Sequence, residues 1–326
     1  MTRVRRARVK ALAKINLDLR VLAKRPDGFH ELRTIFQTIS LADSLDIAFT
    51  PARQTAIALD DALGIPDNLV VRAARLAMEA MRTTGRVEMR LTKRIPMGAG
   101  LGGGSSDAAA VLLALPVLAG RRLEIAPLSR IAAELGSDVP FFLLGGTAVG
   151  IGRGTELFPL PDRPGAPGLL VAPGIHVNTA QAYRDLSPRL TSELQQNKIV
   201  TFQAQTWGGR SVEDRAGGSA NDFESVVFEQ HRSLALLKKR LQRAGARVAM
   251  MTGSGSAVFG LFGDRDGVSR ALAVVRGEKP GVERAFPISL VSRVRYRAIW
   301  RRALREHIQP KHSTPSLWPP QSRYSS

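Results

Sequence analysis

A run of glycines in the first third of the chain most constrains its fold. Five of the seven residues from Gly98 to Gly104 are glycine, and the alanine- and leucine-rich stretch at 108–118 predicts a helix soon after them. Glycine-rich backbone at the N-terminus of a helix presents converging N–H groups, which bind anions. We therefore predict that this segment binds a phosphate group.

Two common kinds of phosphate loop fit the segment poorly. Gly98, Gly100 and Gly103 match the G-x-G-x-x-G spacing of dinucleotide-binding proteins, but the acidic residue expected about 20 residues later is missing. The lysine of the nucleotide-binding P-loop is also missing, because Gly104 is followed by two serines. A dinucleotide-dependent oxidoreductase is therefore the least favoured of the functions considered for this chain.

Composition excludes several other classes of protein. The chain has 326 residues, of which 44% are hydrophobic and 23% are charged, as in an ordinary folded protein. It has no cysteine, so disulfides, thiolate metal sites and cysteine nucleophiles are excluded, and a reducing compartment is compatible. The longest apolar run, 108–119, is too short to span a bilayer. We expect a cytoplasmic protein with no membrane partner.

The net charge of +19 is concentrated at the two ends of the chain. Residues 1–10 and 293–326 together supply +12 of it, and the long segment between them is only mildly basic. This distribution favours an anionic small-molecule site over a dedicated nucleic-acid channel. We expect no specific nucleic-acid partner, and the oligomeric state stays open.

Periodicity indicates a mixed α and β protein. Apolar residues alternate with polar ones from Lys14 to Val21, which is typical of a strand with one buried face and places Lys14 and Asn16 on its other face. One helix is predicted to begin after an N-cap at Asp67 or Asn68, and another at Leu128. The segment 159–168 has four prolines and two glycines and is the best candidate for a domain boundary.

Four motifs occur in a fixed order: Ala-Lys-Ile-Asn at 13–16, the glycine segment at 96–106, Gly-Ser-Asp-Val-Pro at 136–140 and Thr-Gly-Ser-Gly-Ser at 252–256. With Pro-Asp-Gly-Phe-His at 26–30, they make residues 9–295 resemble the GHMP small-molecule kinases. The resemblance implies a two-domain α+β fold with an ATP site in the cleft between the domains. An N-terminal α/β domain, like that of a ribosomal protein, would span 1–165 and a ferredoxin-like α+β domain 166–297. The basic tail at 298–326 is expected to be disordered.

The resemblance also implies a reaction and its catalytic residues. Asp138 would be the general base that takes the proton of an acceptor hydroxyl, and Lys14 would orient it and stabilise the developing charge. Taken alone, Asp138 is a turn residue before Pro140 and Lys14 a solvated strand residue. Their place beside the glycine segment favours the catalytic interpretation.

ATP and Mg²⁺ are the implied cofactors. Ser105 or Ser106 would lie near the metal, whose other ligands stay open. Asn68 would belong to the adenine pocket. The residues that would surround ATP are Pro96, Met97, Gly98, Ala99, Gly100, Leu101, Gly102, Gly103, Gly104, Ser105, Ser106 and Asn68.

Within the family, the chain is most similar to kinases of a cytidine-diphosphate-linked sugar alcohol. Phe29 and Tyr183 would stack on the cytosine, with tyrosine and phenylalanine exchanged relative to the usual order, and His30 would bind its polar edge. Asn16 and Thr179 would help to hold the diphosphate and the polyol.

Two other functions compete with this hypothesis. One is a GHMP kinase for another small alcohol, and the other is a basic nucleic-acid-binding protein. Nucleic-acid binding would weaken steeply with added salt, whereas turnover of a cytidine substrate would depend on Mg-ATP.

Overall fold

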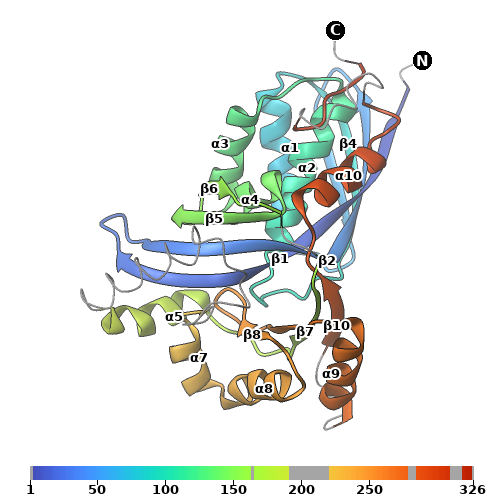
Figure 1. Cartoon of the computed structure of the whole chain (residues 1–326). Helices are drawn as coiled ribbons and strands as arrows, with labels where there is room; N and C mark the ends of the chain where they lie inside the picture. Colours follow the sequence, from blue (N-terminus) through green and yellow to red (C-terminus); the bar gives the residue numbers. More distant parts are fainter. Residues whose placement is uncertain (1–2, 163–164, 191–219, 278–283, 309–317, 325–326) are drawn as a thin grey trace.

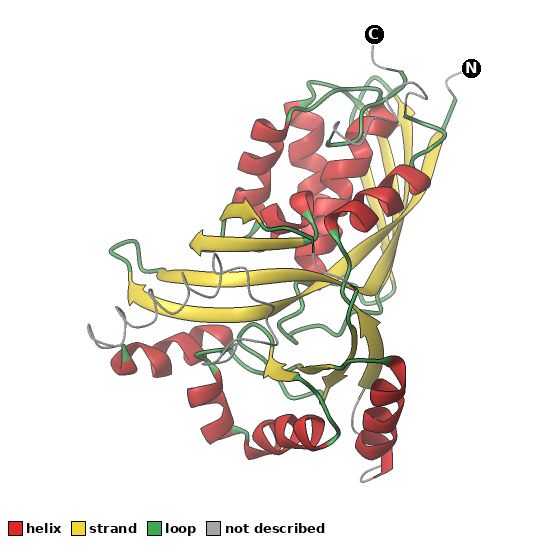
Figure 2. Ribbon diagram, in the orientation of Figure 1, coloured by secondary structure: helices red, strands yellow, loops and turns green. Residues whose placement is uncertain are grey.

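The computed structural model describes residues 3–162, 165–190, 220–277, 284–308 and 318–324. Two sheets form the framework of the molecule, and helices cover each of them (Figures 1 and 2). The first sheet has the order β3-β4-β2-β5-β6, with β1 paired to β2, and the second has the order β10-β7-β9-β8. Only β3 and β4 pair in parallel among these named strands.

The strands of the first sheet are β1 (Arg5–Lys24), β2 (His30–Pro51), β3 (Ala56–Asp61), β4 (Gly85–Thr92), β5 (Thr147–Gly152) and β6 (Glu156–Pro159). Those of the second are β7 (Pro167–Ala172), β8 (Val248–Met251), β9 (Val258–Leu261) and β10 (Arg284–Ser289). The helices beside the first sheet are α1 (Leu69–Ala80), α2 (Gly103–Ala119), α3 (Ile125–Leu135), α4 (Val139–Leu144) and α10 (Arg293–Ala303). Those beside the second are α5 (Thr179–Leu186), α7 (Glu224–Gln230), α8 (Arg232–Arg243) and α9 (Arg265–Gly277).

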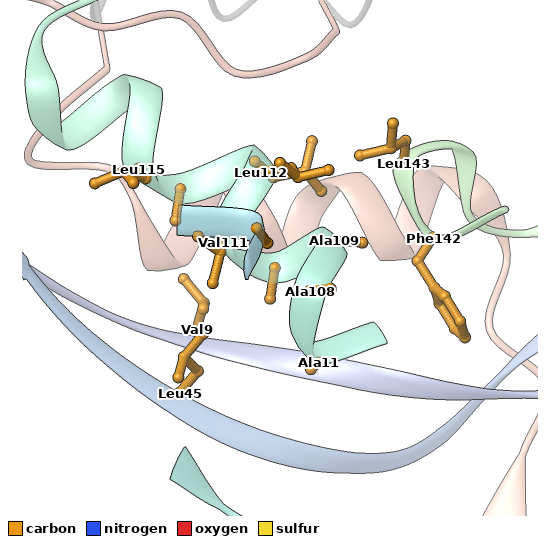
Figure 3. Packing of buried hydrophobic residues seen from close by; sticks show 14 of the residues in the cluster. Val9, Ala11, Leu45, Ala108, Ala109, Val111, Leu112, Leu115, Phe142 and Leu143 are labelled. Atoms are coloured by element: carbon orange, nitrogen blue, oxygen red, sulfur yellow. The ribbon is translucent and has the colours of Figure 1, made fainter. Parts of the chain in front are cut away.

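Helix α2 is the centre of the first domain. All its residues from Ser106 to Leu118 are buried, which is expected of a helix that is apolar on every side. Figure 3 shows Val111 of α2 above Val9 of β1 and Leu45 of β2, with Phe142 and Leu143 of α4 to one side. The predicted helix is confirmed, and its core position fixes the glycine segment at its N-terminal end.

A shared apolar cluster joins the two sheets. Ile15 and Leu17 of β1 pack there with Leu170 of β7 and Phe259 of β9. The long strand β1 therefore contributes to the core of the first domain at one end and contacts the second sheet further along. The last strand of the first sheet ends at Pro159 and β7 begins at Pro167, so we keep 165/166 as the proposed boundary.

The C-terminal tail differs from the disorder that its composition predicted. Disorder was expected from 298 to 326, and this is wrong for the parts that the structure describes, 298–308 and 318–324. Trp300 and Leu304 are buried in the core of the first domain, and Ile308 pairs with Ser322. His307 of this tail is only 7% exposed, with Nε2 2.8 Å from the Arg6 carbonyl. A basic, proline-rich composition did not reveal that a few apolar side chains anchor the segment.

Helix α10 also crosses the proposed end of the second domain at 297. Its Tyr296 and Trp300 belong to the core of the first domain, as does Val291 just before it. In the described residues the second domain therefore ends structurally with β10. Among the helices described, none is both long and apolar enough to cross a membrane.

Candidate active site

Lys14 and Asp138 come together where β1 passes the start of α4. Lys14 Nζ lies 3.3 Å from Asp138 Oδ2, and it donates a hydrogen bond of 2.9 Å to Asn16 Oδ1. The lysine side chain is 4% exposed and that of the aspartate 32%. The pair thus has a buried cation and a carboxylate that solvent or a substrate can reach.

The position of Asp138 leaves its carboxylate available. It is the N-cap residue of α4, but its side chain makes no capping hydrogen bond, and Val139 N donates to the carbonyl of Gly136 instead. Pro140 follows in the first turn, where its missing N–H costs nothing. The carboxylate therefore faces Lys14 rather than its own helix.

The glycine segment forms a loop that ends in helix α2. Gly98, Gly100 and Gly102 have φ values of 64°, 76° and 67°, which side-chain-bearing residues rarely adopt. Because α2 begins at Gly103, its first backbone N–H groups and its positive dipole end lie at the loop. The loop contacts β1 through Lys14 N, which donates to the Leu101 carbonyl over 3.1 Å. This geometry suits an anion.

The two predicted metal-side serines differ. The Ser106 hydroxyl is buried and donates to the Leu12 carbonyl over 2.7 Å, so it is part of the protein interior. Ser105 is half-buried beside it. Of the other loop residues, Met97 is 62% exposed and Ala99 is buried at 4%.

A turn from the second domain closes on this loop. A Cβ atom at Gly100 would lie 2.2 Å from the Thr252 carbonyl oxygen, so the two backbones are in direct contact. Asn16 makes two hydrogen bonds to the same turn. Its side-chain Oδ1 accepts from Gly253 N over 3.0 Å, and its backbone N donates to Thr252 Oγ1 over 3.1 Å. Asn16 is only 2% exposed, so the structure uses its amide inside the protein, where it links Lys14 to the turn.

Asn68 lies where it was expected, at the start of α1. Its Oδ1 accepts from Val70 N and caps the helix, and its Nδ2 donates to Asp61 Oδ2, both over 3.0 Å. The neighbouring Leu69 side chain approaches Gly104 of the loop, with its Cδ1 3.8 Å from a Cβ placed there. Asn68 therefore belongs to the surroundings of the loop.

The predicted cytosine residues are arranged differently from the expected sandwich. His30 stacks on Tyr183 with ring centroids 4.5 Å apart and 22° between the planes. Phe29 is 46% exposed, and the Arg153 guanidinium lies 3.5 Å above its ring. The stacked pair is thus His30 with Tyr183, and Phe29 stands apart from it under an arginine.

Both members of this pair have perturbed ionisation. Burial raises the pKa of Tyr183, and the charge of the Asp138 carboxylate adds to the rise. Burial and the charge of Lys24 lower the pKa of His30, which favours a neutral imidazole. Thr179, at the start of α5, bonds through Oγ1 to Ser254 Oγ over 2.7 Å and joins the same neighbourhood.

Sequence reasoning missed a buried ionic cluster beneath the loop. Lys93 Nζ lies between the carboxylates of Asp43 and Asp107, 2.6 Å from the latter, and 3.3 Å from a Cβ placed at Gly103. Burial raises the pKa of Asp107 to about 7, against the effect of Lys93 and with that of Asp43. Lys93 and Asp107 flank the glycine segment in the sequence, and this proximity could have suggested that they interact. Asp43 is 50 residues from Lys93, so no local pattern connected it with the cluster.

Asn221 was missed as well. It donates to the carbonyls of Met251 and Gly253 over 2.9 and 2.7 Å, and so holds the turn that faces the loop. In the described residues, no group of three or more histidine, aspartate or glutamate side chains is placed to hold a metal ion.

Comparison with known proteins agrees with this geometry. Residues 68–146 match the GHMP kinases N terminal domain and 209–280 match GHMP kinases C terminal. A 4-diphosphocytidyl-2-C-methyl-D-erythritol kinase of Solibacter usitatus is 67% identical over 330 residues, covering 100% of both chains. The enzyme of that name from Pelobacter propionicus is 40% identical over 268 residues, 81% of this chain and 92% of its own.

Solved structures give the same result. A crystal structure of 4-(cytidine 5'-diphospho)-2C-methyl-D-erythritol kinase aligns with a TM-score of 0.71 and 37% identity, over 87% of this chain and 98% of that one. The mevalonate kinase of L. major aligns with a TM-score of 0.64 at 16% identity, which shows a shared fold alone.

The chain therefore belongs to the GHMP kinase family, as its motifs predicted, and has the two-domain α+β fold of that family. It is an ATP-dependent phosphotransferase. Within the family, its relatives at 67% and 40% identity are both named 4-diphosphocytidyl-2-C-methyl-D-erythritol kinase, which defines the branch to which it is similar.

Proposed function

We propose that this enzyme transfers the γ-phosphate of ATP to the 2-hydroxyl of 4-diphosphocytidyl-2-C-methyl-D-erythritol, a step of the non-mevalonate isoprenoid pathway. The observation that carries the proposal is the 67% identity over the whole length of both chains with a kinase of that name. The pairing of Lys14 with Asp138 beside a phosphate-binding loop supports it from the structure.

Asp138 acts as the general base in this proposal. Its carboxylate accepts the proton of the substrate hydroxyl as the oxygen attacks the γ-phosphorus of ATP, and Lys14 holds the carboxylate 3.3 Å away. A carboxylate is a weak base, so much of the rate enhancement comes from positioning and from electrostatic stabilisation, as is usual for phosphoryl transfer. Asn16 orients Lys14 through its bond to Nζ.

The glycine loop holds the phosphates of ATP with backbone N–H groups. Mg²⁺ suits this site because it binds through the phosphates and few protein oxygens, and Ser105 is the protein ligand that we propose. We prefer Ser105 to Ser106 because Ser106 is only 2% exposed and its hydroxyl donates to the Leu12 carbonyl. When bound, the ion would neutralise charge on the transferring group.

The cytidine part of the substrate is proposed to bind near His30 and Tyr183. A flat aromatic surface stacks on a base, and a neutral imidazole can exchange hydrogen bonds with its polar edge. Thr179 bonds to Ser254 of the turn at 252–256, and this position supports a role in holding the diphosphate of the substrate. We place Phe29 at the outer side of this site, where the Arg153 guanidinium covers its ring in the structure.

The test is Asp138→Asn, which keeps the size of the side chain and removes its basicity. We expect kcat for the cytidine substrate to fall by roughly 10² to 10⁴, with KM for ATP within a few-fold. Asp60→Asn is the matched control, since Asp60 pairs with Arg90 at the surface of β3. Near-normal turnover of Asp138→Asn would show that another group is the base.

Substrate choice is tested separately, by measuring ADP release with a panel of alcohols. The proposal requires the enzyme to phosphorylate the cytidine substrate and to phosphorylate mevalonate and homoserine very little, because these two alcohols have no nucleobase for the site to bind. Equal use of a base-free alcohol would make the protein a GHMP kinase of different specificity.

A further inference from the structure

Helix α4 carries the predicted base at its N-terminal end and is only six residues long. The last carbonyl groups of any helix lack partners within the helix, and in a helix this short they make up much of the element. Gly145 N donates to the Phe141 carbonyl. The next two carbonyls accept from side chains: Phe142 O from Tyr296 Oη over 2.5 Å, and Leu143 O from Trp318 Nε1 over 2.6 Å.

Both donors come from the C-terminal part of the chain. Tyr296 lies on α10, and its ring is in contact with Gly145, where a Cβ atom would lie 2.3 Å from it. The ring of Trp318 is 6.2 Å from that of Tyr296, and the Arg297 guanidinium lies 5.1 Å from its centroid. The segment 318–324 is fixed further by Ser322 Oγ, which donates to the Val117 carbonyl over 2.8 Å.

Helix α4 contacts the reaction centre along its length. The Phe142 ring lies against the glycine loop, since a Cβ at Gly102 would be 2.9 Å from its Cζ and 3.3 Å from Lys14 Cε. Asp138, directly before the helix, pairs with Lys14. A shift of α4 at its Asp138 end would therefore move the carboxylate away from Lys14.

We propose that Trp318 and Tyr296 are positioning residues for phosphoryl transfer: they hold the C-terminal end of α4 and so keep Asp138 against Lys14. This rests on the proposed function, in which Asp138 is the base. The C-terminal segment, expected to be disordered, then has a part in turnover. The full-length match to the Solibacter relative includes this segment.

The decisive variant is Trp318→Phe, which keeps an aromatic ring and removes the donor to Leu143. Leaving a buried carbonyl unpaired displaces or strains its element, so we expect kcat to fall roughly tenfold. KM for ATP and for the cytidine substrate should stay within about twofold, because neither binding surface is touched. Tyr296→Phe removes the neighbouring donor in the same way and should have the same effect.

Tyr324→Phe is the matched control. It also removes one polar atom from an aromatic ring of the same segment, but its hydroxyl bonds to His307, away from α4. We expect its kcat to equal that of the unaltered enzyme. Thermal unfolding of all variants establishes that each is folded, and an equal loss of kcat in Tyr324→Phe would mean that the segment acts only through general stability.

A double-variant cycle tests whether the effect passes through Asp138. If it does, Trp318→Phe should lower kcat no further in the Asp138→Asn background, whereas a full tenfold additional loss would overturn the proposal. The two hypotheses fail differently. Normal turnover of Asp138→Asn removes the proposed base, while an impaired Asp138→Asn with normal turnover in both Trp318→Phe and Tyr296→Phe removes the positioning role alone.

Discussion

Lys14 is a cation with only 3% of its surface exposed, and such a charge is stable only when it is paired. Asp138 supplies the opposite charge, and Asn16 supplies a neutral acceptor that itself is held by Thr252 and Gly253. Removing Lys14 would relax both contacts and leave Asp138 unpaired. The burial of the lysine therefore does two things: it fixes the carboxylate, and it connects the two domains at the reaction centre.

At the residue scale, His30→Ala should raise KM for the cytidine substrate several-fold and weaken discrimination between cytosine and uracil. An aromatic pair contributes about 0.5 to 1.5 kcal/mol, and a site that hydrogen-bonds a polar edge rejects analogues that leave it unpaired. KM for ATP should not change. His231→Ala, at the junction of α7 and α8, is the control. A defect confined to ATP would place His30 outside the cytidine site.

At the scale of elements, the start of α2 is held by the cluster of Asp43, Lys93 and Asp107. Two carboxylates share one ammonium, so the fully ionised cluster is buried with a net charge of −1. Burial lowers the pKa of Lys93, but the two carboxylates outweigh this effect and raise it. Because the pKa of Asp107 is raised, the proton that neutralises the cluster binds to Asp107. Asp43 also accepts from the backbone of Ile95 over 2.8 Å, which ties the entry of the glycine loop to β2.

This cluster predicts how stability depends on pH. The pKa of Asp107 is about 7 in the folded protein, above its ordinary 3.8. Between these values the folded state holds a proton that the unfolded state has lost, so the free energy of unfolding falls as the pH rises from about 4 to 7. Asp107→Asn should remove this contribution. Urea unfolding at several pH values checks this prediction. The free energy of unfolding of the variant should increase relative to that of the natural protein as the pH rises, and a difference that does not change with pH would contradict the assignment.

At the scale of the whole molecule, the two domains meet along β1 and where the loop at 98–104 contacts the turn at 252–256. The contact is made by backbone: Ala257 N donates to the Ala99 carbonyl over 3.3 Å, and Gly100 lies against Thr252. Two glycine-rich segments can approach this closely because they have no side chains between them. The relative position of the domains thus depends on residues that also form the proposed phosphate site.

Gly100→Ala should disturb this contact. Its φ of 76° strains an alanine by about 1 to 3 kcal/mol, and the new Cβ would lie 2.2 Å from the Thr252 oxygen. We expect a lower midpoint of unfolding and a raised KM for ATP. Gly104→Ala is the control for stability, because a Cβ there meets only Leu69 at 3.8 Å in the first turn of α2. Equal unfolding midpoints for the two variants would contradict the argument.

The sequence by itself determined what depends on neighbours along the chain. Positive φ values favour glycine, a helix start presents N–H groups, and Asn68 caps the helix that begins beside it, so the loop, α1 and α2 were predictable locally. The ordered motifs were sufficient for the family and its two-domain fold. Local patterns could not show that His30 stacks on Tyr183, or that Asp43 joins Lys93.

Only the tertiary structure decided which distant residues complete the site. Lys14 and Asp138 lie on different elements, and their distance depends on the packing of α4 against α2. The tail shows the reason most clearly. Trp318 is one apolar residue in a basic, proline-rich segment, and its half-buried place depends on a carbonyl of α4 and on the Tyr296 ring of α10. A surface made from separate parts of the chain exists only after folding, so no local pattern could indicate it.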